Sequence, residues 1–172
     1  HFETHLEFDR SWGLGSSSTF TSLLAQFANL DTLDFFHEAH GGSGYDLACA
    51  SAAGPILYRI EKGSAEATPV EWSPAFGDDL AFVFSGKKQL TSESLALVQK
   101  QPFKQQQIEE SNALTSAFIN ASTIERIETV MREHEQLIGG HLGLLTVSEQ
   151  LFKGYDGAVK SLGGWGGDFV LV

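Results

Sequence analysis

Hydrophobic and polar side chains alternate over residues 1–10, and this period of two predicts a half-buried β-strand. Residues 12–19 are rich in glycine and serine and predict a turn. After the turn, large apolar residues recur with the spacing of an amphipathic helix, at Phe20, Leu23, Leu24, Phe27 and Ala28. The serines before them stand where N-cap residues belong. The chain therefore opens as a strand, a glycine/serine loop and a helix.

The middle of the chain predicts a short helix, a loop and then strands. Asp31 is placed to cap a helix that ends near Glu38, and a glycine-rich loop follows over residues 40–46. Strand composition then recurs in the segments 55–60, 68–72 and 80–85. Gly63 and the prolines of residues 69–74 interrupt this region. We therefore expect one domain over residues 1–75 and another over residues 76–172.

The second half is mainly helical by its periodicity. Helices are expected over residues 91–100, 103–120, 123–138 and 142–152. Gly139 and Gly140 are expected to end the third of them. Residues 158–161 and 168–172 predict two strands around a glycine-rich hinge. Strands mixed with long helices, without strict alternation, predict an α+β fold.

The charge balance narrows the possible partners. Eleven basic against twenty-two acidic residues give a net charge of −11, which repels nucleic acid and anionic membrane surfaces. A single cysteine, Cys49, excludes an internal disulfide, and no apolar run is long enough to span a bilayer. We expect a cytoplasmic protein with no nucleic-acid or membrane partner. A local phosphate site stays compatible with this charge, because backbone N–H groups can hold an anion.

The first glycine-rich segment has the features of a phosphate-binding loop, over Gly13, Leu14, Gly15, Ser16, Ser17 and Ser18. Glycines allow a close approach of the backbone to an anion, and the following helix directs free N–H groups at it. Serine hydroxyls can bind phosphate oxygens or Mg²⁺. A serine-rich turn that only starts a helix is the alternative interpretation.

The second segment places a carboxylate, Asp46, just after a glycine loop. Such a carboxylate can accept a proton from a substrate hydroxyl or orient that hydroxyl. From spacing alone, an ordinary turn or helix start is the favoured interpretation of this aspartate. Upstream, His37 and His40 lack further ligands at metal-site spacing, whereas Glu38 is a candidate ligand for Mg²⁺.

The third segment is a run of glycines between the last two predicted strands: Gly163, Gly164, Gly166 and Gly167. Glycines at such a point mark either a close approach of backbone to a ligand or a sharp bend. A tight hairpin is the simpler interpretation of this segment taken alone.

Taken together, the three segments resemble the GHMP kinase superfamily. The first resembles its nucleotide-binding motif, and Gly42-Ser43-Gly44-Tyr45-Asp46 resembles the element that carries the catalytic aspartate in mevalonate-type members. Residues 160–168 resemble its C-terminal glycine motif, in the order expected of the family. The Gly-Tyr-Asp element and the Gly-Gly-Trp-Gly-Gly-Asp-Phe ending are most similar to the mevalonate-kinase-like "GYDIA" subgroup.

The resemblance implies a GHMP-kinase-like two-domain fold, with an incomplete N-terminal α/β part and a helix-rich, ferredoxin-like α+β C-terminal part. The family's N-terminal motif, with its lysine and glutamate, has no counterpart before Asp9, and Asp9 replaces the family's proline. A strict count for the metal-binding glutamate falls on Phe35 or Phe36 rather than on Glu38. We therefore expect this chain to be an incomplete kinase, slow or inactive by itself.

The resemblance also implies the site. Residues 13–18 would bind the β- and γ-phosphates of ATP, Ser17 and Glu38 would bind Mg²⁺, and Asp46 would be the catalytic residue. The C-terminal glycines would help to enclose substrate and nucleotide. The implied reaction transfers the γ-phosphate to a hydroxyl, or a phosphate, of a small mevalonate-like acceptor.

Other functions remain open at this point. A sugar or an amino acid is the competing acceptor class within the kinases. A nucleotide-binding remnant without catalysis, or an α+β interaction module with purely structural glycine loops, would fit the same composition. An incomplete domain exposes apolar surface, which favours association, and a homodimer is the assembly that we expect in that case.

Overall fold

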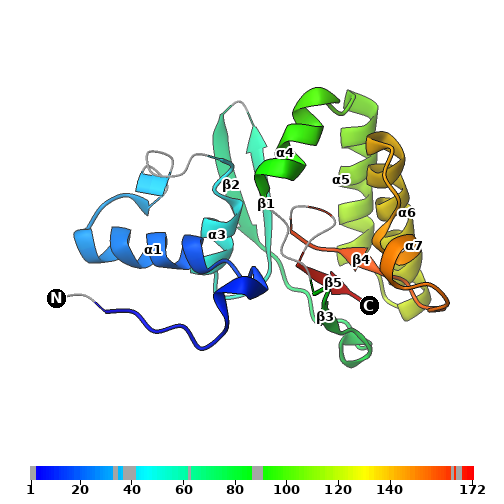
Figure 1. Cartoon of the computed structure of the whole chain (residues 1–172), viewed down its shortest axis with the longest axis horizontal. Coiled ribbons are helices and arrows are strands. Elements are labelled where there is room, and N and C mark those ends of the chain that lie inside the picture. Colours follow the sequence, from blue (N-terminus) through cyan, green and yellow to red (C-terminus); the bar gives the residue numbers. More distant parts are fainter. Residues whose placement is uncertain are drawn as a thin grey trace. The chain divides into compact units, whose positions relative to one another are not determined.

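A computed structural model describes residues 3–32, 35–36, 42–61, 63–86, 91–163, 165 and 168–172, with residues 91–95 described by their backbone alone. The chain divides into two compact units, His1–Trp72 and Ser73–Val172 (Figure 1). Each unit combines helices with a small antiparallel sheet. The expected α+β class is therefore confirmed.

The first unit consists of two helices and a β-hairpin. The 3-10 helix η1 (Arg10–Trp12) leads into α1 (Ser16–Ala28), and α3 (Tyr45–Ser51) packs against α1. The hairpin pairs β1 (Ile56–Glu61) with β2 (Ser64–Pro69), and Glu61 lies opposite Ser64. Gly63, at φ +83, adopts the left-handed conformation that a tight reversal requires. Because the chain reverses here, β2 begins at Ser64 and ends at Pro69. The strand expected over residues 68–72 was therefore placed too late in the sequence.

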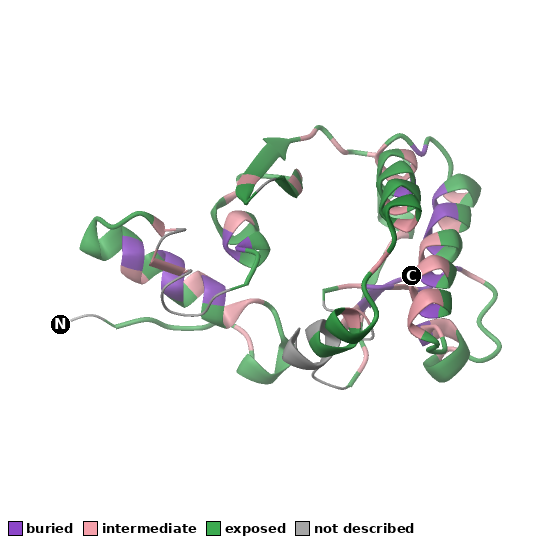
Figure 2. Cartoon of the chain, turned by 90° about the horizontal axis from the view of Figure 1, so that it is seen from above, coloured by how far each residue is buried: buried purple, intermediate pink, exposed green. Residues whose placement is uncertain are grey.

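Helix α1 buries the face opposite to the expected one. Its large apolar residues Phe20, Leu23 and Phe27 are 46%, 41% and 71% exposed. The buried parts of α1, purple in Figure 2, are formed by small residues. The buried residues of α1 are Ser18, Thr21, Ser22 and Ala25. Small side chains allow α3 to approach closely, which bulky residues at these positions would prevent. The predicted helix is confirmed, but its predicted core face is wrong.

The strand expected over residues 1–10 is also wrong. Residues 3–9 contain no strand, and none of the described strands pairs with them. An alternating pattern gives a stable strand only when a neighbouring strand satisfies its N–H and C=O groups. The helix expected from Asp31 to Glu38 lies partly outside the described residues. Within the described part, Phe35 N–H donates to the carbonyl of Asp31 at 3.0 Å, a helical hydrogen bond.

The second unit places helices against a three-stranded antiparallel sheet. The strands stand in the order β3 (Phe82–Phe84), β5 (Phe169–Leu171) and β4 (Lys160–Ser161). The short helix η2 (Gly77–Asp79) precedes β3. The helices are α4 (Thr91–Lys100), α5 (Gln105–Ile119), α6 (Ile124–Leu142) and α7 (Val147–Leu151). These elements confirm the helices expected near 91–100, 103–120 and 123–138, and the strands expected within 80–85, 158–161 and 168–172.

Helix α6 carries the core of this unit. Ile127, Val130 and Met131 are at most 2% exposed, at the spacing of one helix face, and α6 packs on both α5 and β4. Val147, Val159 and Val170 form a further buried cluster that joins α7 to the sheet. Within the described residues, no helix has both the length and the apolar character needed to cross a membrane.

Two helix boundaries in this unit differ from the expected ones. Gly139 and Gly140 do not end α6, which continues to Leu142 and is capped by Gly143 at φ +66. A helix tolerates glycine inside it at a modest cost, whereas the left-handed cap position strongly favours glycine. The helix expected over 142–152 is shorter, because Thr146 caps α7 in a capping box with Glu149.

Candidate functional site

The loop before α1 is shaped by two glycines in the left-handed conformation. Gly13 has φ +72 and closes η1, and Gly15 has φ +71 and stands at the N-cap of α1. A Cβ atom at Gly15 would meet nothing within 4 Å, so the backbone conformation alone requires glycine there. Before the loop, the Asp9 carboxylate accepts a 2.8 Å hydrogen bond from Ser11 N–H, which lowers the pKa of Asp9. Asp9 therefore serves to start η1.

The N-terminus of α1 has no side-chain cap. The first helical hydrogen bond joins Thr19 N–H to the carbonyl of Gly15 at 3.0 Å, so the N–H groups of the preceding serines lie at the open end of the helix. The three serines occupy the first helical turn, and the expectation that they cap the helix is wrong, since Gly15 holds that position. Open N–H groups and the positive end of a helix dipole form an anion-binding geometry.

The serine side chains of this turn are not equivalent. Ser17 is exposed, Ser16 is half-buried, and Ser18 is 5% exposed. The hydroxyl of Ser17 is accordingly available to a ligand, whereas Ser18 contributes to the packing of α1 in this unit. Leu14, between the two glycines, is 45% exposed.

The shorter helix α3 begins in the same way as α1. Gly44 stands at its N-cap with φ +74, again without a side-chain cap, and Asp46 lies in the first turn with an exposed side chain. A carboxylate in the first turn is stabilised by the helix dipole. The two segments that the sequence singled out in this half of the chain therefore stand at the starts of two helices.

Packing of the two helices fixes these starts in one unit. Ser22 Oγ of α1 lies 3.4 Å from Ser51 Oγ of α3, and Leu47 of α3 is 4% exposed. The small buried face of α1 is what permits this contact. The loop of residues 13–18 and Asp46 are thus carried by two helices that pack against each other (Figure 1).

Two tyrosines hold the segment before α3. The hydroxyl of Tyr58 in β1 donates to the carbonyl of Ser43, and the rings of Tyr45 and Tyr58 meet edge to face at 5.7 Å. Burial, followed by a hydrogen bond with Cys49 and the charges of Cys49 and Asp46, raises the pKa of Tyr45 to about 12. Tyr45 is therefore neutral at pH 7. No functional role is predicted for Tyr58 from the sequence, where its place on a predicted strand was the available signal.

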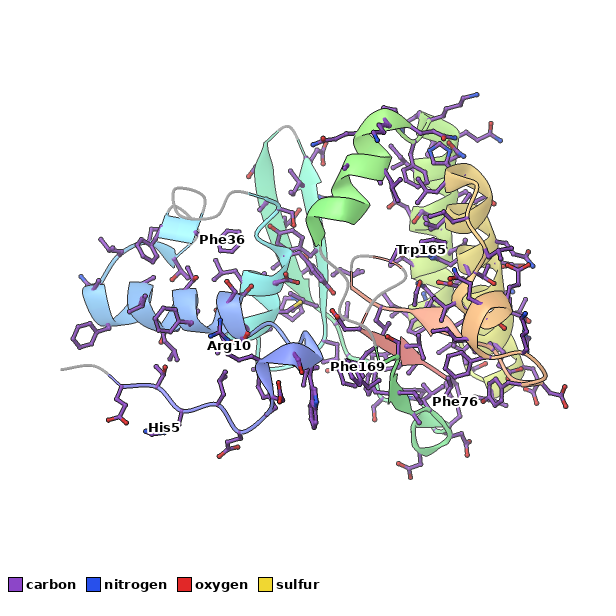
Figure 3. The ribbon with its side chains drawn as sticks, in the orientation of Figure 1. His5, Arg10, Phe36, Phe76, Trp165 and Phe169 are labelled. Atoms are coloured by element: carbon purple, nitrogen blue, oxygen red, sulfur yellow. The ribbon has the colours of Figure 1, made fainter. Side chains whose placement is uncertain are left out.

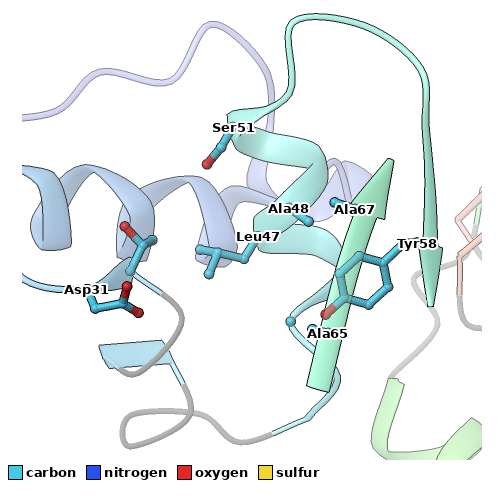
Figure 4. A pocket seen from close by; sticks show the side chains of 9 residues that line it. Asp31, Leu47, Ala48, Ser51, Tyr58, Ala65 and Ala67 are labelled. Atoms are coloured by element: carbon cyan, nitrogen blue, oxygen red, sulfur yellow. The ribbon is translucent and has the colours of Figure 1, made fainter. Parts of the chain in front are cut away.

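A shallow hollow lies between α3 and the hairpin, in the region shown in Figure 4. Its volume is about 290 Å³, and it continues into a second hollow of about 600 Å³ with which it shares Ala48, Ser51 and Ala67. Asp31, Thr32 and Tyr58 supply polar groups to the smaller hollow. None of these lining residues was predicted from the sequence to bind a ligand, and Asp31 was expected only to cap a helix. Asp46 does not line either hollow.

The third glycine-rich segment lies in the second unit, where it joins β4 to β5 as an antiparallel hairpin. Gly163 is exposed and has φ +64, and Ser85 N–H donates to the carbonyl of Asp168 at 2.8 Å. Gly164, Gly166 and Gly167 lie outside the described residues, as do His37, Glu38 and His40. The magnesium role of Glu38 therefore stays a prediction.

The described residues contain no cluster of three or more His, Cys, Asp or Glu side chains arranged to hold a metal ion. A bound Mg²⁺ that keeps most of its waters needs only one or two protein ligands, and the exposed hydroxyl of Ser17 fits that requirement. Comparison of the chain with protein-family models, curated proteins and solved structures gives no significant match.

Proposed function

We propose that this chain binds Mg·ATP and belongs to a small-molecule kinase of the GHMP type, with the two-domain fold of that superfamily. The observation that carries the proposal is the uncapped N-terminus of α1 behind two left-handed glycines, Gly13 and Gly15. The N–H groups of Ser16, Ser17 and Ser18 would bind the phosphates of the nucleotide. The exposed hydroxyl of Ser17 would ligate Mg²⁺.

In the proposed reaction, Asp46 accepts the proton of the acceptor hydroxyl. The hydroxyl oxygen forms a bond to the γ-phosphorus, the bond between that phosphorus and the β–γ bridging oxygen breaks, and ADP leaves. ATP supplies the phosphoryl group when it is bound. Positioning and charge stabilisation provide most of the catalysis in such transfers. The exposed position of Asp46 at the start of α3 is compatible with contact to a substrate.

Nucleotide binding without transfer is the second candidate function. The observation that favours it is that Asp46 lines neither of the two hollows described beside α3. The two candidates agree on the loop of residues 13–18 and differ only in the role of Asp46. The mevalonate-like acceptor and the ferredoxin-like second unit stay part of the kinase proposal.

Thermal unfolding with and without Mg·ATP tests the shared part. Nucleotide at about 100 times its Kd is expected to add roughly 2.7 kcal/mol, a rise in Tm of several degrees. Gly15→Ala is expected to reduce this rise, because alanine at φ +71 changes the loop. Gly154→Ala is the matched control, since Gly154 has φ +85, equally open surroundings and a place in the other unit.

A second variant pair separates the two candidates. Ser17→Ala is expected to weaken the Mg²⁺ dependence of the Tm rise, and Asp46→Asn is expected to leave nucleotide binding intact while removing phosphoryl transfer to an acceptor alcohol such as mevalonate. Equal transfer by Asp46→Asn and the parent would exclude the catalytic role. A Tm unaffected by Mg·ATP would exclude both candidates.

A further inference from the structure

His141, in the last turn of α6, joins three helix ends of the second unit. Its half-buried imidazole contacts Gln101, which directly follows α4, and Gln107, which lies in the first turn of α5. The side chains at this junction of α4, α5 and α6 are drawn in Figure 3. All three residues belong to the second unit, and none takes part in the proposed nucleotide site.

The partners of the two ring nitrogens fix the protonation state of the imidazole. Nε2 of His141 lies 2.8 Å from the carbonyl oxygen of Gln101, which can only accept, so Nε2 carries a hydrogen. Nδ1 lies 3.0 Å from Nε2 of Gln107. Oε1 of the same amide accepts a 3.0 Å hydrogen bond from Lys104 N–H, so the amide nitrogen faces His141 as a donor. Nδ1 is therefore an acceptor without a hydrogen, and the ring is neutral.

Hydrogen bonds run in series through the neutral ring. Lys104 N–H donates to Gln107, and Gln107 in turn donates to Nδ1 of His141. Nε2–H of the ring donates to the carbonyl of Gln101, whose own side-chain amide donates to the carbonyl of His141 at 2.5 Å. The last bond satisfies a carbonyl near the open end of α6, and the first is half of a capping box at the start of α5. The series ties the start of α5 to the ends of α4 and α6.

Protonation of the ring breaks this series at one point. A hydrogen on Nδ1 of His141 sets two donors, the imidazolium and the amide nitrogen of Gln107, against each other. A half-turn of the amide offers Oε1 to the imidazolium, but it then turns the amide nitrogen toward Lys104 N–H, which also only donates. A hydrogen bond to a charged ring is stronger than one to a backbone N–H. The bond from Lys104 N–H is therefore the one that is lost.

The other surroundings of the ring hold it in place in either state. The ring of Phe103 lies 4.0 Å from the imidazole, centroid to centroid, at 31°, and an aromatic face attracts a cation. The C-terminal end of α6 also favours a positive charge. The charged residues of the adjoining helix segments are Lys100 of α4 and Lys104 and Glu110 of α5, all with exposed side chains. Among the described residues, His141 forms no ion pair. The change on protonation is therefore confined to the link through Gln107.

We propose that His141 is a pH-sensitive switch that caps the start of α5 through Gln107 when neutral and releases that cap when protonated. Histidine is the side chain that ordinarily changes its charge between pH 5 and pH 8, so the switch operates within that range. In the released form, Lys104 N–H loses its acceptor and the first turn of α5 loses its capping hydrogen bond.

The switch is tested by ¹H–¹⁵N NMR of the full chain from pH 8 to pH 5. The amide proton of Lys104 is expected to move upfield with the same midpoint as the ring protons of His141, because it loses a hydrogen bond. Thr146 N–H is the internal reference, since it donates to Glu149 at 2.7 Å in a capping box that involves no histidine. Hydrogen bonds from Thr146 lower the pKa of Glu149, so this reference stays constant over the range. A Lys104 amide that stays constant while His141 titrates would overturn the proposal.

Three variants show whether the signal passes through the two side chains. His141→Gln removes the titration, and Gln107→Glu supplies two acceptor oxygens, one for Lys104 N–H and one for the imidazolium. Both are expected to abolish most of the movement at Lys104, with the fold checked by far-UV circular dichroism. Gln106→Glu adds the same charge in the same turn at an exposed position and is expected to leave the movement unchanged. Movement as large as in the parent, in either of the first two variants, would overturn the switch.

Discussion

The hydroxyl of Ser161 donates a 2.6 Å hydrogen bond to Oε1 of Glu135, which joins the short strand β4 to the middle of α6. The same oxygen accepts hydrogen bonds from Ser161 N–H and from the ammonium of Lys160, both at 3.0 Å. Glu135 is 2% exposed, and the side chain of Lys160 is 16% exposed. One buried carboxylate therefore organises the attachment of the strand to the helix.

Replacing Glu135 with alanine is expected to destabilise the second unit by about 3 kcal/mol. The change leaves a largely buried ammonium without its partner, and such losses are the costly ones for buried ion pairs. Urea unfolding measures the effect. Lys160→Met in the Glu135→Leu background is expected to recover part of the loss, because two apolar side chains replace the pair. Glu66→Ala, which breaks the exposed Arg59–Glu66 pair at 2.7 Å, serves as the control and should have little effect.

The half-buried imidazole of His134 predicts a pH dependence of stability. Burial and, to a smaller extent, the positive charge of Lys160 together lower the pKa of His134 to about 4, against the opposing effect of Glu135. In the unfolded chain His134 therefore binds a proton near pH 6.5, whereas in the folded chain it binds this proton only near pH 4. The contribution of neutral His134 to the free energy of unfolding is fully present above pH 6.5 and is lost progressively as the pH falls to 4.

The size of this effect is about 2 kcal/mol after allowance for the solvent-exposed part of the ring. His134→Phe keeps a ring of similar size and removes the titration. Urea unfolding at intervals from pH 7 to pH 4 should therefore give a smaller loss of stability for the variant than for the parent. Parallel losses in the two proteins would mean that other groups account for the pH dependence.

Sequence periodicity located most helices, because long helices repeat their pattern over several turns. It could not choose the buried face of α1, where the large apolar residues suggest one side and the packing of α3 selects the small residues Ser18, Ser22 and Ala25. It also misplaced the strand at residues 1–10, since a strand depends on a partner that alternation does not reveal. The glycine loop and Asp46 were found by local chemistry, whereas Tyr58 acts through a contact distant in sequence.

The reversed orientation of α1 can be tested with two substitutions on opposite faces. Phe27→Ser alters a side chain that is 71% exposed and is expected to change stability by less than about 0.5 kcal/mol. Ala25→Leu inserts volume at a position that is 0% exposed and is expected to cost about 1–3 kcal/mol. Thermal unfolding compares the two. A large loss for Phe27→Ser and none for Ala25→Leu would restore the face expected from the sequence.

The exposed aromatic and aliphatic side chains of α1 also predict binding of a hydrophobic dye. Phe20, Leu23 and Phe27 share one exposed face of a helix whose sequence contains no charged residue. A continuous apolar face of this kind binds 8-anilinonaphthalene-1-sulfonate. Phe27→Ser is expected to reduce the dye fluorescence without loss of helical circular dichroism. Trp12→Ser, which removes a different exposed ring outside α1, is the comparison that shows whether the face itself is responsible.

The end of α6 gives the sharpest test of the described boundaries. Gly140 lies inside the helix with an exposed position and open space around its Cβ, so Gly140→Ala is expected to stabilise the protein by about 0.5–1 kcal/mol. Gly143 has equally open surroundings but φ +66, so Gly143→Ala is expected to destabilise it by about 1 kcal/mol. Both variants add a single methyl group without a contact, and they differ only in the conformation of the backbone that receives it. If the helix instead ended at Gly139 and Gly140, as the sequence predicts, urea unfolding would show the opposite order, with the loss at Gly140 and the gain at Gly143.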